Sequence, residues 1–184
     1  MRLFIGLDVP YEMRRNLELV LQLLKPTAQI SWSPLSNLHI TNRFIGEWPE
    51  ARLEELGSAL LGVPRPGELR ISIRGIGWYP NPHHPRVLYA GISAPEALTQ
   101  LARDTDAACC TIGMAREVRD FRPHLTLARI KGAADLVALR AAIASLPTAD
   151  FGTYSAAQYH LYESKLSPSG SVYTKLASYP LTTS

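Results

Sequence analysis

The chain has 184 residues, 46% of them apolar, and a formal net charge of +3. This length suits one compact domain or a tight two-lobed unit. The composition excludes a disordered or membrane-spanning protein, because no apolar run approaches the ~20 residues that a spanning helix needs. Nearly all the positive charge is arginine, which suits a phosphate-bearing partner without requiring one. Adjacent Cys109 and Cys110 exclude a disulfide scaffold and agree with a reducing cytoplasm, where we expect the protein.

The first half of the chain alternates strand and helix patterns. The apolar stretch 2–8 is followed closely by Pro10 and lacks a cleavage site, so it is interpreted as a first strand rather than a signal peptide. A helix follows Pro10, then "ISWS" and a strand through His39, and a second helix begins near Pro49.

The second half continues the mixed order. The expected elements are strands at 68–79 and 86–93 around the turn "PNPHHP", a helix from Pro95 to about Thr111, a strand with His124, an alanine-rich helix at 133–146, and strands at 156–166 and 172–181 joined by "SPSG". This order predicts one α+β unit spanning residues 1–184. Because each His-x-Thr strand precedes a helix, it also predicts two lobes related by pseudo-symmetry.

The motif His-x-Thr occurs twice, in "NLHITNRFIG" at His39 and Thr41 and in "FRPHLTLARI" at His124 and Thr126. On a strand, residues i and i+2 point to the same face, about 6.5–7 Å apart. If the two strands are neighbours, two imidazoles and two hydroxyls line one groove.

These four side chains suit in-line displacement at phosphorus without a metal. One neutral imidazole accepts a proton from the attacking oxygen, and one imidazolium donates a proton to the leaving oxygen. The threonine hydroxyls then donate to the non-bridging oxygens, where negative charge gathers.

A single strand histidine is more often structural than catalytic, but two copies of the motif among five histidines favour a function. A metal site is the weaker interpretation, because neither motif has Cys, Asp or Glu at ligand spacing. We expect His83 and His84 to be solvated in their turn and His160 to be structural.

The chain resembles the bacterial and archaeal RNA 2′,3′-cyclic phosphodiesterases of the 2H phosphoesterase superfamily, long called 2′-5′ RNA ligases. The resemblance rests on both motifs and on "MRLFIGLDVP", "HITNRFIGE", "RVLYAGI", "FRPHLTLAR" and "LYESKLSPSGSVYTKLASYPL", in this order. It implies two pseudo-symmetric lobes of mostly antiparallel sheet with outer helices, and an active-site cleft between them.

The resemblance also implies roles. Hydrolysis of a 2′,3′-cyclic phosphate without metal or other cofactor leaves a 2′-phosphate. His39 is then the general acid at O3′ and His124 the general base, while Thr41 and Thr126 hold the phosphate oxygens. Arg129 matches a family arginine near the phosphate. Simple alternation places it on the face opposite His124, so a bulge or the strand's end must bring it in.

The sequence departs from the family at two positions. Asn42 replaces a common leucine, so its amide needs a hydrogen-bond partner in or beside the core. Tyr89 replaces a tryptophan and can pack there or contact a base. Phe44 is a candidate base-stacking residue, although packing in the core is the commoner role for such a phenylalanine.

The expected partner is RNA ending in a 2′,3′-cyclic phosphate, or a cyclic nucleotide, bound by a monomer with no membrane association. Arg43 or Arg86 is expected, with Arg129, to attract phosphate. Two alternatives stay open: a cyclic phosphodiesterase for a small nucleotide such as ADP-ribose 1″,2″-cyclic phosphate, and a non-catalytic RNA-binding module. Weak 2′-5′ RNA ligation is the microscopic reverse of ring opening.

Overall fold

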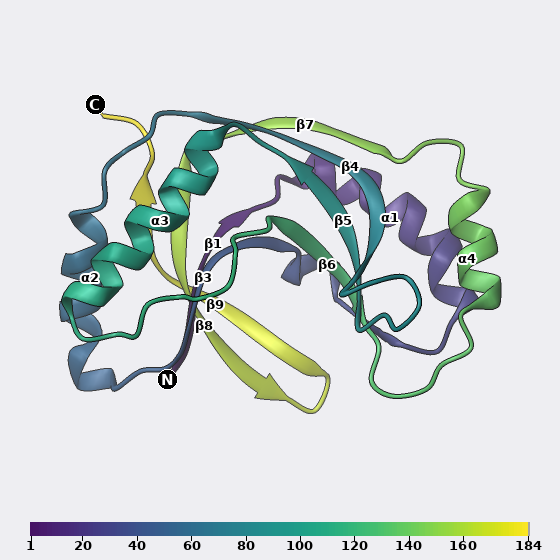
Figure 1. The fold of residues 1–184 in the computed structure, drawn as a ribbon, viewed down its shortest axis with the longest axis horizontal. Helices are drawn as coiled ribbons and strands as arrows, with labels where there is room; N and C mark the ends of the chain where they lie inside the picture. Colours follow the sequence, from purple (N-terminus) through teal and green to yellow (C-terminus); the bar gives the residue numbers. More distant parts are fainter. Residues whose placement is uncertain (184) are drawn as a thin grey trace.

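The computed structural model describes residues 1–183, and its strands form one nine-stranded sheet (Figure 1). The order is β7-β4-β5-β6-β3-β1-β8-β9, with the short β2 paired to β6, and every pair of neighbours is antiparallel. The strands are β1 (Arg2–Asp8), β2 (Ser31–Trp32), β3 (His39–Glu47), β4 (Leu69–Tyr79), β5 (Val87–Ser93), β6 (His124–Arg129), β7 (Asp150–Ala156), β8 (Gln158–Ser167) and β9 (Gly170–Pro180).

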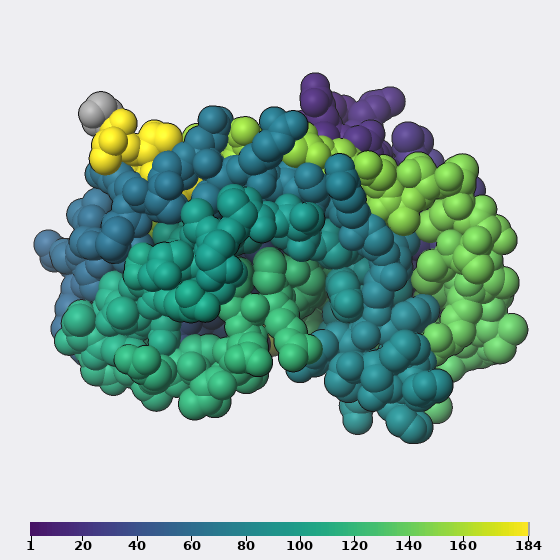
Figure 2. All heavy atoms as spheres, turned by 45° about the horizontal axis from the view of Figure 1, so that its top comes forward, coloured from purple at the N-terminus to yellow at the C-terminus, as the bar shows by residue number. Residues whose placement is uncertain are grey.

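The helices lie in two pairs outside this curled sheet. They are α1 (Tyr11–Leu24), α2 (Leu53–Leu61), α3 (Glu96–Thr111) and α4 (Val137–Ala144), with short 3₁₀ turns at Lys25–Thr27, Leu35–Asn37 and Glu50–Arg52. Figures 1 and 2 show α2 with α3 at one end of the molecule and α1 with α4 at the other. Within residues 1–183, no helix combines the length and the apolar character that crossing a bilayer requires. The predicted α+β class, with antiparallel sheet and outer helices, is confirmed.

The expected elements differ from the structure in two places. The alanine-rich helix is shorter than 133–146: α4 begins at Val137, whose N–H donates to the Asp135 carboxylate (3.1 Å) in an Asx turn that precedes the helix. Strand β7 was not predicted, since a glycine interrupts its short polar sequence "DFGTYSA". It nevertheless pairs with β4, and the hydroxyls of Ser72 and Thr153 lie 2.7 Å apart across that pair.

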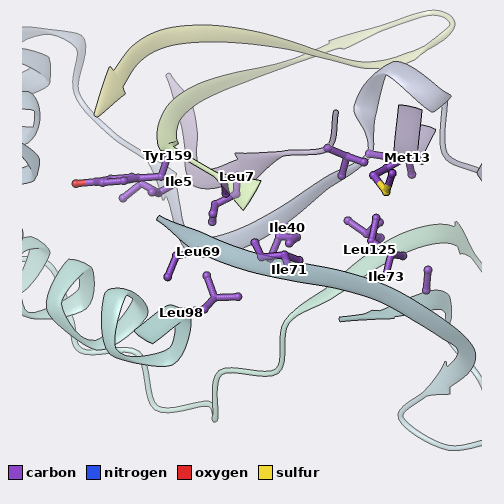
Figure 3. Packing of buried hydrophobic residues seen from close by; sticks show 14 of the residues in the cluster. Ile5, Leu7, Met13, Ile40, Leu69, Ile71, Ile73, Leu98, Leu125 and Tyr159 are labelled. Atoms are coloured by element: carbon purple, nitrogen blue, oxygen red, sulfur yellow. The ribbon is translucent and has the colours of Figure 1, made fainter. Parts of the chain in front are cut away.

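One hydrophobic core runs between the sheet and the helices (Figure 3). From α1 it takes Met13, Leu17, Leu21 and Leu24, which recur at helical spacing. From the sheet it takes alternate residues of the central strands, among them Ile40 and Leu125, each with 0% exposure. Both of these are the middle residue of a His-x-Thr motif, so packing of the core fixes which way each motif faces.

Candidate active site

The two motifs meet where β3 and β6 pair. The only residue pair joining these strands in the described sheet is Ile40 with Leu125. Since both of these side chains enter the core, the alternation of a strand turns His39, Thr41, His124 and Thr126 to the opposite face. All four are partly exposed there. The sequence prediction that the motif strands are neighbours is therefore confirmed.

The pairing also sets how the four side chains are arranged. Continuing the antiparallel register by one residue in each direction places His39 beside Thr126 and Thr41 beside His124. The histidines then occupy opposite corners of a four-residue square, with Cα atoms about 8–9 Å apart by ordinary strand geometry. A phosphoryl group at the centre of this square would have one imidazole on each side.

Both histidines are oriented in the same way. Nδ1 of His39 lies 2.7 Å from the carbonyl oxygen of Asn37, and Nδ1 of His124 lies 2.7 Å from that of Arg122. A carbonyl only accepts, so Nδ1 carries hydrogen in each ring and donates it. The exchangeable position is then Nε2 in both rings, and Nε2 of His39 lies 2.9 Å from the hydroxyl oxygen of Thr41.

The environment of His39 shifts its protonation. Burial lowers the pKa of His39, and the charges of His124 and Arg129 act in the same direction. The hydrogen bond to the Asn37 carbonyl and the carboxylate of Asp8 oppose this shift without cancelling it. The free protein therefore favours a neutral imidazole at His39, and a bound phosphate anion would push the pKa back up.

Aromatic rings surround each histidine. The ring of His39 lies 4.5 Å from that of Phe4 and meets Tyr173 edge-on at 5.2 Å, measured between centroids. The ring of His124 meets Tyr89 edge-on at 5.6 Å. Tyr89 has room because Gly77 lies opposite it on β4, where an added Cβ would come within 2.4 Å of the tyrosine ring. Tyr89 therefore packs against the second motif.

A β-bulge turns Arg129 toward the motif face. In the β5–β6 pair, Thr126 lies opposite Tyr89 and Ala128 opposite Leu88, so Leu127 is an extra residue. Such a residue reverses the alternation beyond it, and Arg129 returns to the face of Thr126. The side chain of Arg129 is exposed, and its positive charge contributes to lowering the pKa of His39. Of the two possibilities that the sequence left for Arg129, a bulge or the strand's end, the structure has the bulge.

The first motif is followed by a matching bulge. In the β1–β3 pair, Thr41 lies opposite Gly6 and Arg43 opposite Ile5, so Asn42 is the extra residue. The pseudo-symmetry thus equates Asn42 with Leu127 and Phe44 with Arg129. Phe44 is 41% exposed, and the guanidinium of Arg2 lies 5.4 Å from its ring centre. Phe44 therefore lies on the motif face rather than in the core.

Asn42 does not have the partner that its burial seemed to require. Its side chain is 7% exposed, and neither amide atom has a hydrogen-bond partner among the described residues. Leu127 fills the equivalent position of the other half without this cost. A buried unpaired amide is unfavourable by about 1–3 kcal/mol.

Replacing Asn42 with leucine should therefore raise the free energy of unfolding by about 1–3 kcal/mol, which urea denaturation at neutral pH would measure. The matched control is Leu127→Asn, which places the same amide at the equivalent position and should be destabilising. A loss of stability in Asn42→Leu would show that the amide is satisfied by a group that leucine cannot replace.

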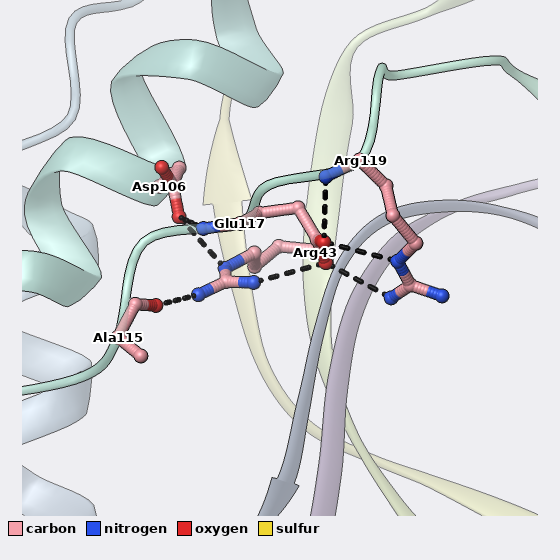
Figure 4. A network of polar contacts seen from close by, with 5 residues as sticks. All are labelled: Arg43, Asp106, Ala115, Glu117 and Arg119. Carbon is pink, nitrogen blue, oxygen red and sulfur yellow. Dashed lines mark hydrogen bonds and ion pairs between the residues drawn. The ribbon is translucent and has the colours of Figure 1, made fainter.

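Of the two arginines considered beside Arg129, Arg43 is buried and already bound to carboxylates, so it is not available to a substrate phosphate. It is 8% exposed and lies on the core side of the sheet, opposite Ile5. Its guanidinium faces Asp106 of α3 and the segment that carries Ala115 and Glu117 (Figure 4). Its Nε lies 3.1 Å from Asp106, its Nη1 3.2 Å from Glu117, and its Nη2 donates to the Ala115 carbonyl at 2.6 Å. These contacts attach α3 and the segment leading to His124 to β3.

Arg86 is exposed, as a phosphate-attracting residue needs to be. It lines an open groove of about 530 Å³ together with His83, His84 and Arg140. Ile130, which follows Arg129 in the sequence, also lines this groove. His83 and His84 are solvated, as predicted.

Sequence reasoning missed Asp8, which pairs with His39 across β1 and β3. The available signal was its position as the one charged residue inside the apolar opening strand, after Arg2.

The comparisons with known proteins cover nearly the whole chain. A profile of the family described as LigT like Phosphoesterase matches residues 7–89 and 91–173, one match for each half. The RNA 2′,3′-cyclic phosphodiesterase of Methanothermobacter thermautotrophicus is 32% identical over 95% of this chain and 96% of its own length. The protein of the same name from Archaeoglobus fulgidus is 33% identical over 96% and 98%.

The fold has close solved counterparts. A crystal structure from Thermus thermophilus superimposes with a TM-score of 0.83 at 29% identity, covering 98% of both chains. Together with the profile matches, which fall on the two halves that carry the motifs, this places the chain in the LigT-like family of 2H phosphoesterases.

Proposed function

We propose that this protein hydrolyses RNA 2′,3′-cyclic phosphate ends to 2′-phosphomonoesters, without a metal. The observation that carries the proposal is the pair of imidazoles at opposite corners of one four-residue site, each with Nδ1 bound to a carbonyl and Nε2 free to exchange a proton. Relatives named RNA 2′,3′-cyclic phosphodiesterase, about a third identical over nearly the full length, support the substrate class.

The geometry suits an in-line reaction. Nε2 of His124 accepts a proton from water as its oxygen attacks phosphorus. On the opposite side the bond from phosphorus to O3′ breaks, and Nε2 of His39 gives its proton to O3′. The products are a 2′-phosphate and a free 3′-hydroxyl, and exchange of one proton with solvent restores both imidazoles.

The threonines and Arg129 act on the charge of the phosphate. When Nε2 of His39 carries the proton destined for O3′, it no longer accepts a hydrogen bond from Thr41, so the Thr41 hydroxyl hydrogen is free for a non-bridging oxygen. Thr126 serves the same purpose from the other strand, and Arg129 adds a permanent positive charge. Exposed Phe44, equivalent in position to Arg129, offers a ring on which a base can stack.

The test is incubation with a 2′,3′-cyclic nucleotide in EDTA, with the position of the product phosphate determined by phosphorus NMR. We expect full activity in chelator. We also expect only the 2′-phosphate as product, because a rigid site holds O3′ of the cyclic phosphate in line with the attacking water. A 3′-phosphate product would reverse the assignment of His39 as acid. Loss of activity in EDTA, restored by a divalent ion, would contradict the metal-free mechanism.

A salt series separates the candidate substrates. We expect an oligonucleotide ending in a cyclic phosphate to have a lower KM than the cyclic mononucleotide, and this advantage to shrink as salt rises, because Arg86 and Arg129 attract the added phosphates. A preference for ADP-ribose 1″,2″-cyclic phosphate that does not depend on salt would favour the small-nucleotide alternative. Tight RNA binding without turnover would favour the binding module.

A further inference from the structure

A second polar cluster lies beside the first motif, centred on the carboxylate of Asp8. Lys175 of β9 donates to its Oδ2 at 2.5 Å, and the hydroxyl of Tyr162 on β8 donates to its Oδ1. Nε2 of His160 lies 3.4 Å from Oδ2, while Nδ1 of His160 is 2.8 Å from the Ser178 hydroxyl. Burial opposes the charge on Asp8, but these hydrogen bonds and charges outweigh it and lower its pKa. The cluster therefore holds a fixed anion.

This anion faces His39. Asp8 and His39 are direct partners across the β1–β3 pair, and partners in a sheet share a face with Cβ atoms about 4.5–5.5 Å apart. Strand β1 lies between β3 and β8. The residue nearest to Asp8 on the same face of β1 is Gly6, which pairs with Thr41 of β3 and with His160 of β8. An added Cβ there would lie 3.4 Å from Cδ2 of His39 and 2.8 Å from the Ile40 carbonyl oxygen. The absence of a side chain at Gly6 leaves room for the imidazole of His39 against β1.

Each strand around His39 contributes a group to its environment. Besides Asp8 on β1, these are His124 and Arg129 on β6, Tyr162 on β8 and Tyr173 on β9. The charged neighbours on β6 disfavour a positive imidazole, and among these groups only Asp8 favours one.

We propose that Asp8, held by Lys175, Tyr162 and His160, is a positioning residue whose charge favours the protonated, acid form of His39. The inference rests on the proposed function, in which His39 is the acid. Asp8 makes no hydrogen bond to His39, whose nitrogens are bound to Asn37 and Thr41, so it acts through its charge.

The role has a distinct effect on the pH profile. The working form has His39 charged and His124 neutral. At pH above both pKa values, kcat/KM is proportional to the fraction of His39 that is protonated. At pH below both values, kcat/KM depends only on the fraction of His124 that has lost its proton. A change that affects the proton on His39 alone therefore alters the alkaline arm and spares the acid arm.

The experiment compares Asp8→Asn with the unaltered protein on a 2′,3′-cyclic nucleotide across the full profile. We expect kcat/KM to fall about three- to tenfold on the alkaline arm and to change less than about twofold on the acid arm, as expected for loss of one nearby charge. In Asp8→Asn/Lys175→Met, the unbalanced lysine charge is also gone, so the alkaline loss should be smaller than in Asp8→Asn.

The matched control is Asp150→Asn, which removes an exposed carboxylate that pairs with Arg74 at 3.5 Å on the outer strands β7 and β4. It should leave both arms unchanged. An equal loss on both arms in Asp8→Asn would overturn the proposal in favour of a structural role. A gain on the acid arm would overturn it by identifying His39 as the base. Failure of the proposed function would look different, since the unaltered protein would then not hydrolyse the cyclic phosphate at any pH.

Discussion

His39→Ala and His124→Ala should each lower kcat/KM for a 2′,3′-cyclic nucleotide by about 10²–10⁴-fold, the usual contribution of a general acid or base. The two losses should differ in their pH dependence. His39→Ala removes the acid, so the alkaline arm set by the fraction of protonated His39 should disappear from the residual rate. His124→Ala should remove the acid arm in the same way. Steady-state kinetics from about pH 5 to 9 would measure both.

Both substitutions should leave the fold intact, because each imidazole is partly exposed and its neighbours Ile40 and Leu125 keep their places in the core. Thermal unfolding followed by circular dichroism would verify this. His83→Ala and His84→Ala, which alter exposed histidines in the β4–β5 turn, are matched controls and should retain full activity. If either motif variant kept more than about a tenth of the activity at every pH, the paired-histidine mechanism would be wrong.

Much of the candidate site could be predicted because its signal is local. A His-x-Thr motif in an apolar strand fixes which side chains share a face, since the middle residue is apolar and enters the core. Two such motifs then define one site as soon as their strands are neighbours. The need for a bulge near Arg129 was also predictable, because alternation alone placed that residue on the wrong face.

Other features depend on contacts between residues far apart in the sequence. The first bulge, at Asn42, left no trace in the sequence, yet it turns Phe44 to the motif face and Arg43 to the core side. The carboxylate of Asp8 is held by a hydrogen bond from Lys175, which lies 167 residues away along the chain. Strand β7 exists because β4 offers it an unpaired edge, although its own sequence has little strand character.

Arg43 shows how the two halves of the site are joined. Its guanidinium on β3, two residues after Thr41, binds Asp106 of α3 and both Ala115 and Glu117 of the segment before His124 (Figure 4). Arg119 also binds Glu117, at 2.9 Å, and its hydrogen bonds and charge lower the pKa of Glu117 to about 2. The carboxylate is therefore ionised throughout the working pH range. One buried cation thus holds the approach to the second motif against the strand of the first.

Arg43→Met should lower the free energy of unfolding by about 3 kcal/mol, since methionine fills part of the space but leaves carboxylates without their buried cation. Asp106 and Glu117 retain some access to water, which places the expected loss at the lower end of the range for broken buried pairs.

Urea denaturation would measure this loss of unfolding free energy, and Arg103→Met is the matched control. Arg103 pairs with Glu96 at 3.2 Å on the exposed surface of α3, where such a pair contributes less than about 1 kcal/mol. Equal losses in the two variants would show that the Arg43 network adds no more than a surface pair. In Arg43→Met we also expect kcat/KM to fall, because the loosened segment leads into β6, which carries His124 and Thr126.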